Sequence, residues 1–316
     1  MKKILITGGS GFIGSNLANY YSQYNKVIVF DNHRRGKISS LIKNKNLRII
    51  KGDITNRNQV KKALDKVDIV IHLAYINGTE FFYKYPEKIL EIAAKGIINI
   101  IECSIEKNIQ ELYLASSSEV YQNPKIIPTP EEIPLIVPDI LNPRYTYGGG
   151  KILTELYGVH YAKYFKKLII FRPHNVYGPN MGNEHVIPQL LIKANKIKNS
   201  KKSLSILGDG NQTRSFIYIS DFINSFDLIL KKGKNKNIYN IGNEQEVSIN
   251  NLVKKIKKTV DINNKVINID NHKGSPKRRC PDNTKLVKLG YKMSIDLNKG
   301  LYLTNEWYKS LKYYKR

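Results

Sequence analysis

The chain has 316 residues, and its 52 Lys and Arg against 26 Asp and Glu give a formal net charge of +26 at pH 7. A chain of this length can bury one or two hydrophobic cores without disulfide bonds or metal ions to hold them. Hydrophobic residues make up 41% and charged residues 25% of the sequence, which is typical of a soluble globular protein and excludes intrinsic disorder.

The positive charge comes mainly from scattered lysines. Of the basic residues, 42 are Lys and 10 are Arg. The lysines occur in short pairs, and no arginine-rich helix or arm stands out. We therefore expect no nucleic-acid partner, in spite of the charge, but a lysine-covered surface around a site for an anionic small molecule.

Neither cysteine lies at a spacing typical of a metal or redox site. Cys103 and Cys280 are far apart in the sequence, so we expect no disulfide framework, no metal site and a reducing compartment. No apolar run approaches the roughly 18 residues of a membrane span, and no signal peptide is evident at the N-terminus. These features predict a cytoplasmic protein without a membrane partner.

Short apolar strands alternate with amphipathic helices through the first half of the chain. The predicted strands cover residues 3–7, 26–30, 47–50, 68–73, 110–115 and 167–171. The predicted helices cover residues 12–24, 57–66, 86–108 and 147–165. This alternation is typical of βαβ units, and it predicts an α/β fold with a Rossmann-type doubly wound parallel sheet.

The pattern becomes irregular after residue 171. Three prolines, Pro173, Pro179 and Pro188, interrupt the alternation of strands and helices. A lysine-rich helix is predicted over 186–200. A strand over 236–241 is predicted to return to the main sheet. We therefore expect a smaller, partly interleaved C-terminal α/β domain. The first domain would comprise 1–172 with about 213–241, and the second 173–212 with 242–316.

A glycine-rich loop follows the first predicted strand and opens the first predicted helix. It reads Thr-Gly-Gly-Ser-Gly-Phe-Ile-Gly over 7–14. Gly8, Gly11 and Gly14 allow a tight turn, a close approach of the backbone to a pyrophosphate, and close packing of helix on strand. The helix N-terminus offers N–H groups and a positive dipole end to the anion. This loop predicts a dinucleotide-binding site.

Three acidic or small residues at later strand ends fit the same site. Asp31 closes the second strand, where a carboxylate can accept hydrogen bonds from the hydroxyls of the adenosine ribose and would repel a 2′-phosphate. This favours NAD over NADP. Arg34 and Arg35, which stand nearby, weaken this preference because their positive charges could accept a 2′-phosphate. Asp53 follows the third strand and suits the adenine edge, and Ala74 follows the fourth and allows close approach to the cofactor. His72, just before it, is expected to pack within the sheet.

A tyrosine and a lysine one helical turn apart suggest acid–base chemistry. Tyr147 and Lys151 lie at i and i+4 on one helical face, where the ammonium stabilises a phenolate. Tyr147 is thus a candidate general base for a sugar hydroxyl, and Lys151 can also hold the nicotinamide ribose. The fifth predicted strand ends in Ser116, Ser117 and Ser118, one of which can hydrogen-bond the reacting oxygen.

In this order, these motifs resemble the extended short-chain dehydrogenase/reductase superfamily, and within it the NAD-dependent nucleotide-sugar epimerase/dehydratase family. The resemblance covers nearly the whole chain. Later matching segments are Arg-Pro-His-Asn-Val-Tyr-Gly-Pro over 172–179, Gly-Asp-Gly-Asn-Gln-Thr-Arg-Ser-Phe-Ile-Tyr over 208–218, Asn-Ile-Gly-Asn over 240–243 and Lys-Arg-Arg-Cys-Pro-Asp over 277–282.

The resemblance implies a site residue by residue. The first domain would bind NAD and the second the nucleoside diphospho-sugar. The implied cofactor-binding residues are Gly8, Gly11, Phe12, Ile13, Gly14, Asp31, Asp53, Ile54, Leu73, Ala74, Tyr147 and Lys151. The implied catalytic residues are Ser117, Tyr147, Lys151 and Glu119, and the implied substrate-binding residues are Ser117, Ser118, Asn175, Arg214 and Arg279, with Arg278 a weaker candidate. A guanidinium suits a diphosphate.

The sequence departs from the family pattern at four positions. Ala93 stands where Asn is frequent, Gly150 where Ser is frequent, Gln122 where Gly is frequent, and His174 where an aromatic residue is frequent. The run of three glycines from 148 to 150 costs roughly 1 kcal/mol for each glycine relative to alanine in a helix. We expect it to let the cofactor or substrate approach the backbone. None of the departures removes the Ser/Tyr/Lys chemistry.

The family shares oxidation of the sugar C4 hydroxyl to a ketone, and the fate of this ketone sets the reaction. If the hydride returns to the opposite face of the ketone, the enzyme is a 4-epimerase. If water is lost across C5–C6, it is a 4,6-dehydratase. If the 4-keto sugar is released, it is a 4-dehydrogenase. A decarboxylase or 3,5-epimerase also remains open. Glu119 can act on C5, but Ser118 replaces the acidic partner of many dehydratases. We expect a 4-epimerase first. The helices over 86–108 and 147–165 resemble those that pair in a homodimer.

Overall fold

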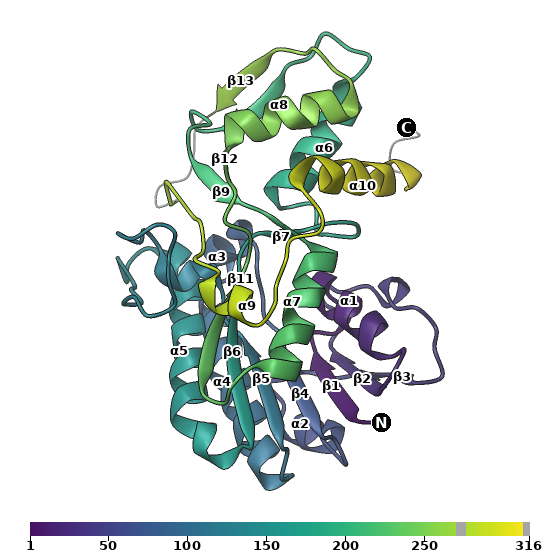
Figure 1. The fold of residues 1–316 in the computed structure, drawn as a ribbon, viewed down its shortest axis with the longest axis vertical. Helices are drawn as coiled ribbons and strands as arrows, with labels where there is room; N and C mark the ends of the chain where they lie inside the picture. Colours follow the sequence, from purple (N-terminus) through teal and green to yellow (C-terminus); the bar gives the residue numbers. More distant parts are fainter. Residues whose placement is uncertain (270–275, 312–316) are drawn as a thin grey trace. The chain divides into compact units, whose positions relative to one another are not determined.

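The computed structural model describes residues 1–269 and 276–311, which fall into two compact units (Figure 1). Unit 1 comprises Met1–Gln122, Pro134–Pro173 and Ser225–Asn240. Unit 2 comprises Asn123–Ile133, His174–Asn224 and the described part of Ile241–Arg316. Neither unit is continuous in the sequence.

Unit 1 is built around a seven-stranded sheet. Its strands are β1 (Lys3–Thr7), β2 (Lys26–Asp31), β3 (Leu47–Lys51), β4 (Ile69–His72), β5 (Glu111–Ala115), β6 (Lys167–Pro173) and β11 (Asn237–Ile241). They lie in the order β11-β6-β5-β4-β1-β2-β3, and the pairs from β3 to β6 are parallel. This is the strand order of a doubly wound sheet, which confirms the predicted fold class. The predicted strand over 236–241 joins its edge as β11.

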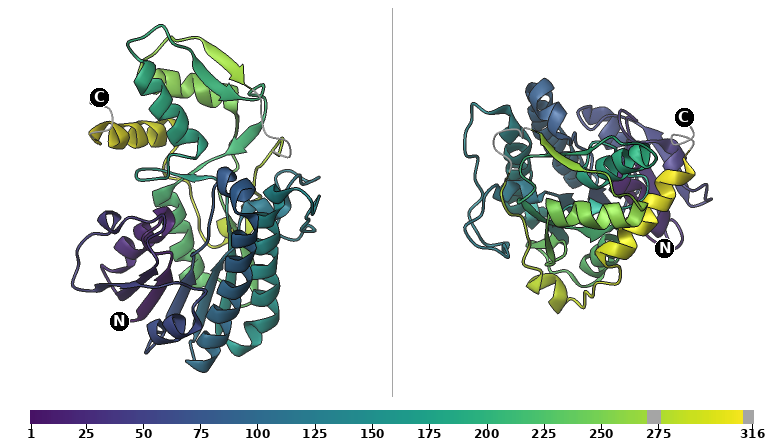
Figure 2. Two further views of the ribbon diagram at one scale, coloured as in Figure 1. Left: turned by 180° about the vertical axis from the view of Figure 1, so that it is seen from behind. Right: turned by 90° about the horizontal axis from the view of Figure 1, so that it is seen from above.

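Helices cover both faces of this sheet. They are α1 (Phe12–Tyr21), α2 (Arg57–Ala63), α3 (Thr79–Lys84), α4 (Pro86–Glu106), α5 (Thr146–Tyr161) and, in part, α7 (Ile219–Lys232). α4 and α5 pack side by side on one face, above Leu112 and Leu114 of β5 (Figure 2). On the other face, Phe226 of α7 packs edge-on against Tyr113 and Phe171. Strand residues alternate between these two cores.

The helices begin within one residue of the predicted starts, where local features fix them, and end two to four residues before the predicted ends. The Asn56 side chain accepts a hydrogen bond from the Gln59 N–H and starts α2, and Pro86 occupies the first turn of α4. Asn108, at φ +53°, follows the end of α4 in the left-handed conformation that stops a helix. Short 3₁₀ turns take up several remaining segments: Ile38–Ser40, Ser118–Tyr121, Pro143–Tyr145 and Ala162–Tyr164.

Unit 2 combines small sheets with helices. Its elements are β7 (Val176–Tyr177), α6 (Val186–Ile197), β8 (Leu204–Leu207), β9 (Thr213–Ser215), β10 (Ile217–Tyr218), β12 (Glu246–Ser248), α8 (Ile249–Val260), β13 (Val266–Ile269), α9 (Thr284–Lys288) and α10 (Leu297–Ser310). The strands pair as β7-β10, β9-β12 and β8-β13. α6, α8 and α10 pack against one another.

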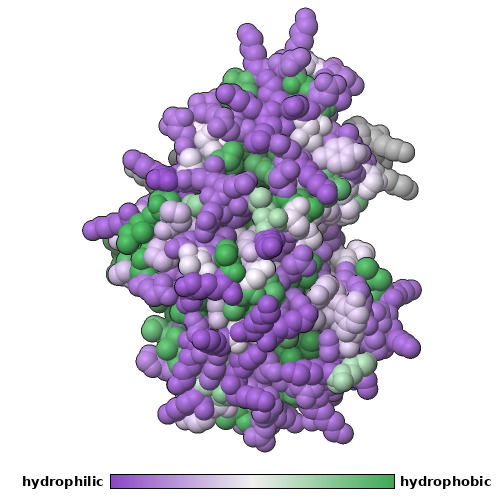
Figure 3. Space-filling model, in the orientation of Figure 1, coloured by the Kyte–Doolittle hydropathy of each residue, from purple (hydrophilic) through white to green (hydrophobic). Residues whose placement is uncertain are grey.

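Hydrophilic side chains are spread widely over the face of the molecule shown in Figure 3. Among the helices of the described residues, none is long and apolar enough to cross a lipid bilayer.

Candidate active site

The glycine loop forms a turn with no room for side chains. Gly8, at φ +67°, lies so close to the chain after β4 that an added Cβ would be 2.8 Å from the Ala74 Cα and N atoms. At Gly14, an added Cβ would be 2.2 Å from the carbonyl oxygen of Gly8. The Gly11 N–H donates to that same carbonyl at 3.1 Å and closes the turn. Phe12 and Ile13 then begin α1, where first-turn N–H groups have no partner within the helix.

Asp31 ties the glycine loop to the end of β2. One of its carboxylate oxygens accepts the Ser10 N–H at 3.0 Å and the other the His33 N–H at 2.7 Å. The side chain is buried. A carboxylate has about four acceptor positions, so two remain for ribose hydroxyls. Asp31 therefore fixes the conformation of the glycine loop and still has acceptor positions for the ribose hydroxyls.

Asp53 is held beside this site by a small hydrogen-bond network. Its carboxylate accepts from the Thr55 N–H and hydroxyl and, at 3.0 Å, from the Asn32 side chain. Burial raises the pKa of Asp53, but these hydrogen bonds outweigh burial and leave the pKa below its usual value. Ile54 follows it, buried against Gly96 of α4.

Thr7 fixes the end of β4 next to the glycine loop. Its hydroxyl oxygen accepts the N–H groups of Leu73 and Ala74 at 3.1 and 3.2 Å, and it lies 2.8 Å from Nδ1 of His72. Burial, together with the positive charge of Lys151, lowers the pKa of His72 to about 3, so this ring is neutral. The expectation that His72 packs within the sheet is confirmed.

Tyr147 and Lys151 project from the first turns of α5 into the interior of unit 1. The Lys151 ammonium lies 5.9 Å from the centre of the Tyr147 ring and donates to the Ala115 carbonyl at 2.8 Å. Burial lowers the pKa of Lys151 to about 7, although the Glu155 carboxylate opposes this shift. The Tyr147 ring stacks on Phe82 of α3. The helix therefore brings the two residues together as their spacing predicted.

The three serines after β5 occupy different environments. Ser116 is buried and donates its hydroxyl to Glu155 of α5. Ser118 is also buried, in the 3₁₀ turn that follows. Ser117 is more accessible, and its oxygen accepts the Glu119 N–H at 3.2 Å. This accessibility supports Ser117, rather than its neighbours, as the serine for a reacting oxygen.

Glu119 lies beside a buried arginine. Its carboxylate is 4.0 Å from the guanidinium of Arg144, which the Asn142 cap positions at the start of a 3₁₀ turn. The backbone carbonyl of Glu119 accepts the side-chain N–H of Gln122 at 2.6 Å. Gln122 adopts φ +52°, in the left-handed region that glycine enters most readily.

The glycine run in α5 makes room mainly for other side chains of the protein. An added Cβ at Gly148 would be 2.7 Å from the Gln122 amide nitrogen, and one at Gly150 would be 2.1 Å from the Tyr75 hydroxyl oxygen. At Gly149 the nearest atom would be 3.6 Å away, an ordinary contact with Val137. Gly148 and Gly150 therefore make room for the side chains of Gln122 and Tyr75, and not for a ligand as the sequence suggested.

Unit 2 gathers the three expected substrate-binding residues around β9. The Asn175 side chain donates to the Ser215 carbonyl at 2.8 Å, and the Ser215 N–H donates to the Arg279 carbonyl at 3.1 Å. Arg214 is the central residue of β9, and Arg279 is buried beside it. Arg278, the weaker candidate, instead makes a bidentate ion pair with Glu246 at 2.7 and 3.1 Å.

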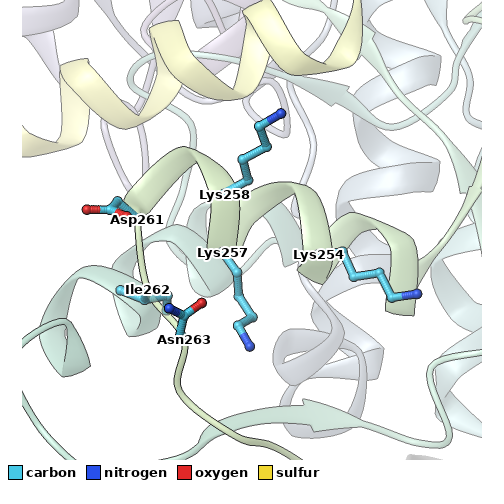
Figure 4. Close-up of a pocket in the computed structure, with 6 residues that line it drawn as sticks. All are labelled: Lys254, Lys257, Lys258, Asp261, Ile262 and Asn263. Atoms are coloured by element: carbon cyan, nitrogen blue, oxygen red, sulfur yellow. The ribbon is translucent and has the colours of Figure 1, made fainter.

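A pocket elsewhere in unit 2 contains none of these residues. It is lined by Lys254, Lys257, Lys258, Asp261, Ile262 and Asn263 at the end of α8. The three lysine side chains point in different directions, so they do not converge on an anion (Figure 4). Within residues 1–269 and 276–311, no cluster of three or more His, Cys, Asp or Glu side chains is arranged to bind a metal.

Two further side chains of unit 1 reach this region: Tyr75, which sequence reasoning missed, and Arg35, which it noted only as a positive charge near Asp31. Tyr75 lies against both Lys151 and Tyr147. Arg35 donates to the Asn77 carbonyl and lies 5.3 Å from the centre of the Phe81 ring. Because β1 lies between β2 and β4, the Arg35 side chain crosses the edge of the sheet at the glycine loop. No local pattern in the sequence predicts the contacts of Tyr75 and Arg35, because the residues that they contact are distant in the sequence.

The residues of unit 1 fit a bound dinucleotide. Gly8 and Gly14 let the loop pack closely against the chain after β4 and against itself, the N-terminus of α1 follows the loop, and Asp31 keeps spare acceptor positions. These features would hold the pyrophosphate and the adenosine ribose. Lys151 would hold the nicotinamide ribose.

Comparison with known proteins agrees with this site. Residues 4–242 match the model of the "NAD dependent epimerase/dehydratase family". The chain is 31% identical to a dTDP-D-glucose 4,6-dehydratase of Dictyostelium discoideum, over 99% of this chain and 83% of that protein. It is also 31% identical to a putative UDP-glucose 4-epimerase of Methanocaldococcus jannaschii, over 97% of this chain and 98% of that protein.

A solved structure with the same fold is a UDP-N-acetylglucosamine 4-epimerase of Methanobrevibacter ruminantium, in complex with UDP-N-acetylmuramic acid. Its TM-score is 0.88 at 27% identity, and the match covers 98% of both chains. The chain therefore belongs to the NAD-dependent epimerase/dehydratase family and is an enzyme whose cofactor is NAD.

Proposed function

We propose that the protein is a nucleoside diphospho-sugar 4-epimerase. One observation favours this reaction over dehydration: position 118 carries a buried serine, and the carboxylate of the same turn, Glu119, is paired with Arg144. A 4,6-dehydratase needs a proton donor for the departing C6 hydroxyl, whereas a 4-epimerase needs none. Relatives that catalyse each reaction are equally similar in sequence, so the site chemistry has to decide.

The residues of unit 1 provide the chemistry of C4 oxidation. When bound, NAD supplies the acceptor for the C4 hydride and returns the hydride in the second half of the reaction. Tyr147 takes the proton of the C4 hydroxyl, so that the C4–O bond becomes a carbonyl, and later gives the proton back. Lys151 stabilises the phenolate by its charge, and Ser117 donates a hydrogen bond to the C4 oxygen.

The residues around β9 in unit 2 suit the nucleotide part of the substrate. Arg214 and Arg279 offer guanidinium groups to a diphosphate, and Asn175 offers an amide. The proposed substrate is therefore a nucleoside diphospho-sugar, as the names of the relatives suggest. The free, buried thiols of Cys103 and Cys280 fit an enzyme of the reducing cytoplasm.

A 4,6-dehydratase is the second candidate, because Glu119 is a carboxylate in the turn that follows the Ser117 position. Once C4 is a ketone, the C5 hydrogen becomes acidic, and a carboxylate there can remove it. Loss of the C6 hydroxyl would complete the elimination.

Incubation with UDP-, dTDP-, GDP- and CDP-sugars, followed by mass spectrometry and NMR, tests the proposal. A 4-epimerase leaves the mass unchanged, and NMR shows the inverted C4. A loss of 18 mass units identifies a dehydratase, a loss of 44 a decarboxylase, and a loss of 2 a released 4-keto product. Tyr147→Phe should abolish the reaction while NAD still binds, and retained turnover would contradict the assigned base.

A further inference from the structure

Tyr75 occupies a space that two small residues, Ala93 and Gly150, leave open. An added Cβ at Gly150 would lie 2.1 Å from the Tyr75 hydroxyl oxygen and 2.7 Å from the Ala93 Cβ. The three residues come from the loop after β4, from α4 and from α5. A side chain at position 150 would therefore force Tyr75 or Ala93 to shift.

The Tyr75 ring lies against the catalytic pair. Its centre is 4.1 Å from the Lys151 ammonium nitrogen, closer than the 5.9 Å that separates this nitrogen from the Tyr147 ring. It also meets the Tyr147 ring edge-on, with 5.1 Å between centres and 90° between planes. A cation over an aromatic face is attracted to the ring, most strongly where water is excluded. Lys151 is such a cation, because it is almost fully buried.

The other groups that face Lys151 leave its charge only partly compensated. Burial lowers the pKa of Lys151 to about 7, and Glu155 of the same helix opposes the shift. The Ala115 carbonyl of β5 accepts a hydrogen bond from the ammonium, and His72 of β4 is neutral. The phenol of Tyr147 also lies beside Lys151, with its ring centre 5.9 Å from the ammonium nitrogen. The face of Tyr75 adds a stabilising contact for the ammonium.

The Tyr75 hydroxyl does not account for this contact. Its oxygen is buried and has no hydrogen-bond partner within the described residues. Burial, with a smaller contribution from Tyr147, raises the pKa of Tyr75, so the phenol is neutral and supplies no anion. The ring rather than the hydroxyl interacts with Lys151.

We propose that Tyr75 is a positioning residue, whose ring face holds the Lys151 ammonium in its charged form beside Tyr147. Ala93 and Gly150 provide the space for this ring. The inference rests on the roles proposed above for Tyr147 and Lys151. It predicts that the ionisation of Lys151 depends on an aromatic face at position 75.

A lysine titration by NMR tests the proposal without any sugar substrate. In protein with ¹³C-labelled lysine, the Cε signal of Lys151 is identified by its absence in Lys151→Met and followed against pH. Tyr75→Leu, which removes the aromatic face, should lower the titration midpoint by about half a pH unit or more. Tyr75→Phe keeps the face and should titrate like the original protein.

Two outcomes would contradict the proposal. A midpoint of Lys151 that stays unchanged in folded Tyr75→Leu excludes a role of the ring, and an equal shift in Tyr75→Phe assigns the effect to the hydroxyl. If Tyr75→Leu does not fold, Tyr75→Met replaces it as a flexible side chain without an aromatic face. An absence of activity on every nucleotide sugar would refute the proposed function and leave the titration result standing.

Discussion

The guanidinium of Arg172 holds the carboxylate of Glu155 in a bidentate ion pair, with nitrogen–oxygen distances of 2.8 and 2.6 Å. Both side chains are almost fully buried. Arg172 also donates to the Tyr121 hydroxyl at 2.6 Å, and Ser116 donates to Glu155. Glu155 lies one helical turn after Lys151. This network therefore joins the ends of β5 and β6 to the helix that carries Tyr147 and Lys151.

Removal of one partner of this ion pair should destabilise the fold strongly. Glu155→Leu leaves the Arg172 guanidinium buried without its anion, and we expect the free energy of unfolding to fall by about 3–5 kcal/mol. Chemical denaturation measures the change. The double variant Glu155→Leu with Arg172→Met removes both charges and should be more stable than Glu155→Leu alone. A loss below about 1 kcal/mol in the single variant would show that the pair is not structurally important.

Two neighbouring glycines of α5 should respond to alanine in opposite ways. Gly149→Ala meets only an ordinary contact with Val137, so it should stabilise the helix by about 1 kcal/mol and raise the Tm by roughly 2–4 °C. Gly150→Ala would place its Cβ against Tyr75 and Ala93 and should destabilise by about 1–3 kcal/mol. Thermal unfolding of both variants measures the difference. Equal effects would contradict the packing described here.

The sequence was sufficient for features that depend on neighbouring residues. The glycine loop, the strands of the sheet and the shared helical face of Tyr147 and Lys151 all follow from local spacing. The contacts of Tyr75 with Gly150 and of Arg172 with Glu155 join segments that are distant in the sequence, and no periodicity encodes such pairs. The irregular part after residue 171 was predicted only in outline, because its described strands, apart from β11, have two to four residues each.

The buried Lys151 should make stability depend on pH. Its pKa falls from an ordinary value near 10.5 to about 7 in the folded protein, so between these values the unfolded chain binds more protons. This site therefore adds stability as the pH rises above about 7. From pH 7 to pH 9 the gain should be about 2–3 kcal/mol, and Lys151→Met should lack it.

Denaturation of both proteins at pH 6, 7, 8 and 9 isolates the contribution of Lys151, because the other titrating groups are shared. The stability difference between the original protein and Lys151→Met should grow in favour of the original as the pH rises. A difference that stays constant with pH would mean that Lys151 has an ordinary pKa.

Asp31 should distinguish the two forms of the cofactor. Asp31→Ala removes acceptors for the adenosine ribose, and we expect the Kd for NAD to rise about tenfold, which corresponds to about 1.4 kcal/mol. NADP should lose less or gain affinity, because the carboxylate no longer repels its 2′-phosphate. Calorimetric titration with both cofactors measures the change. An equal loss for both would mean that Asp31 acts only through its hydrogen bonds to Ser10 and His33.

The helices α4 and α5 should form the interface of a homodimer, as the resemblance to the family implies. The late part of α5 exposes apolar side chains at Leu156 and Val159, which water does not favour on a free surface. Leu156→Glu with Val159→Glu should convert a dimer into a monomer in light scattering. Val287→Glu, an equally exposed apolar position on α9, is the matched control and should leave the dimer intact. A monomeric original protein, or a double variant that stays dimeric, would contradict this interface.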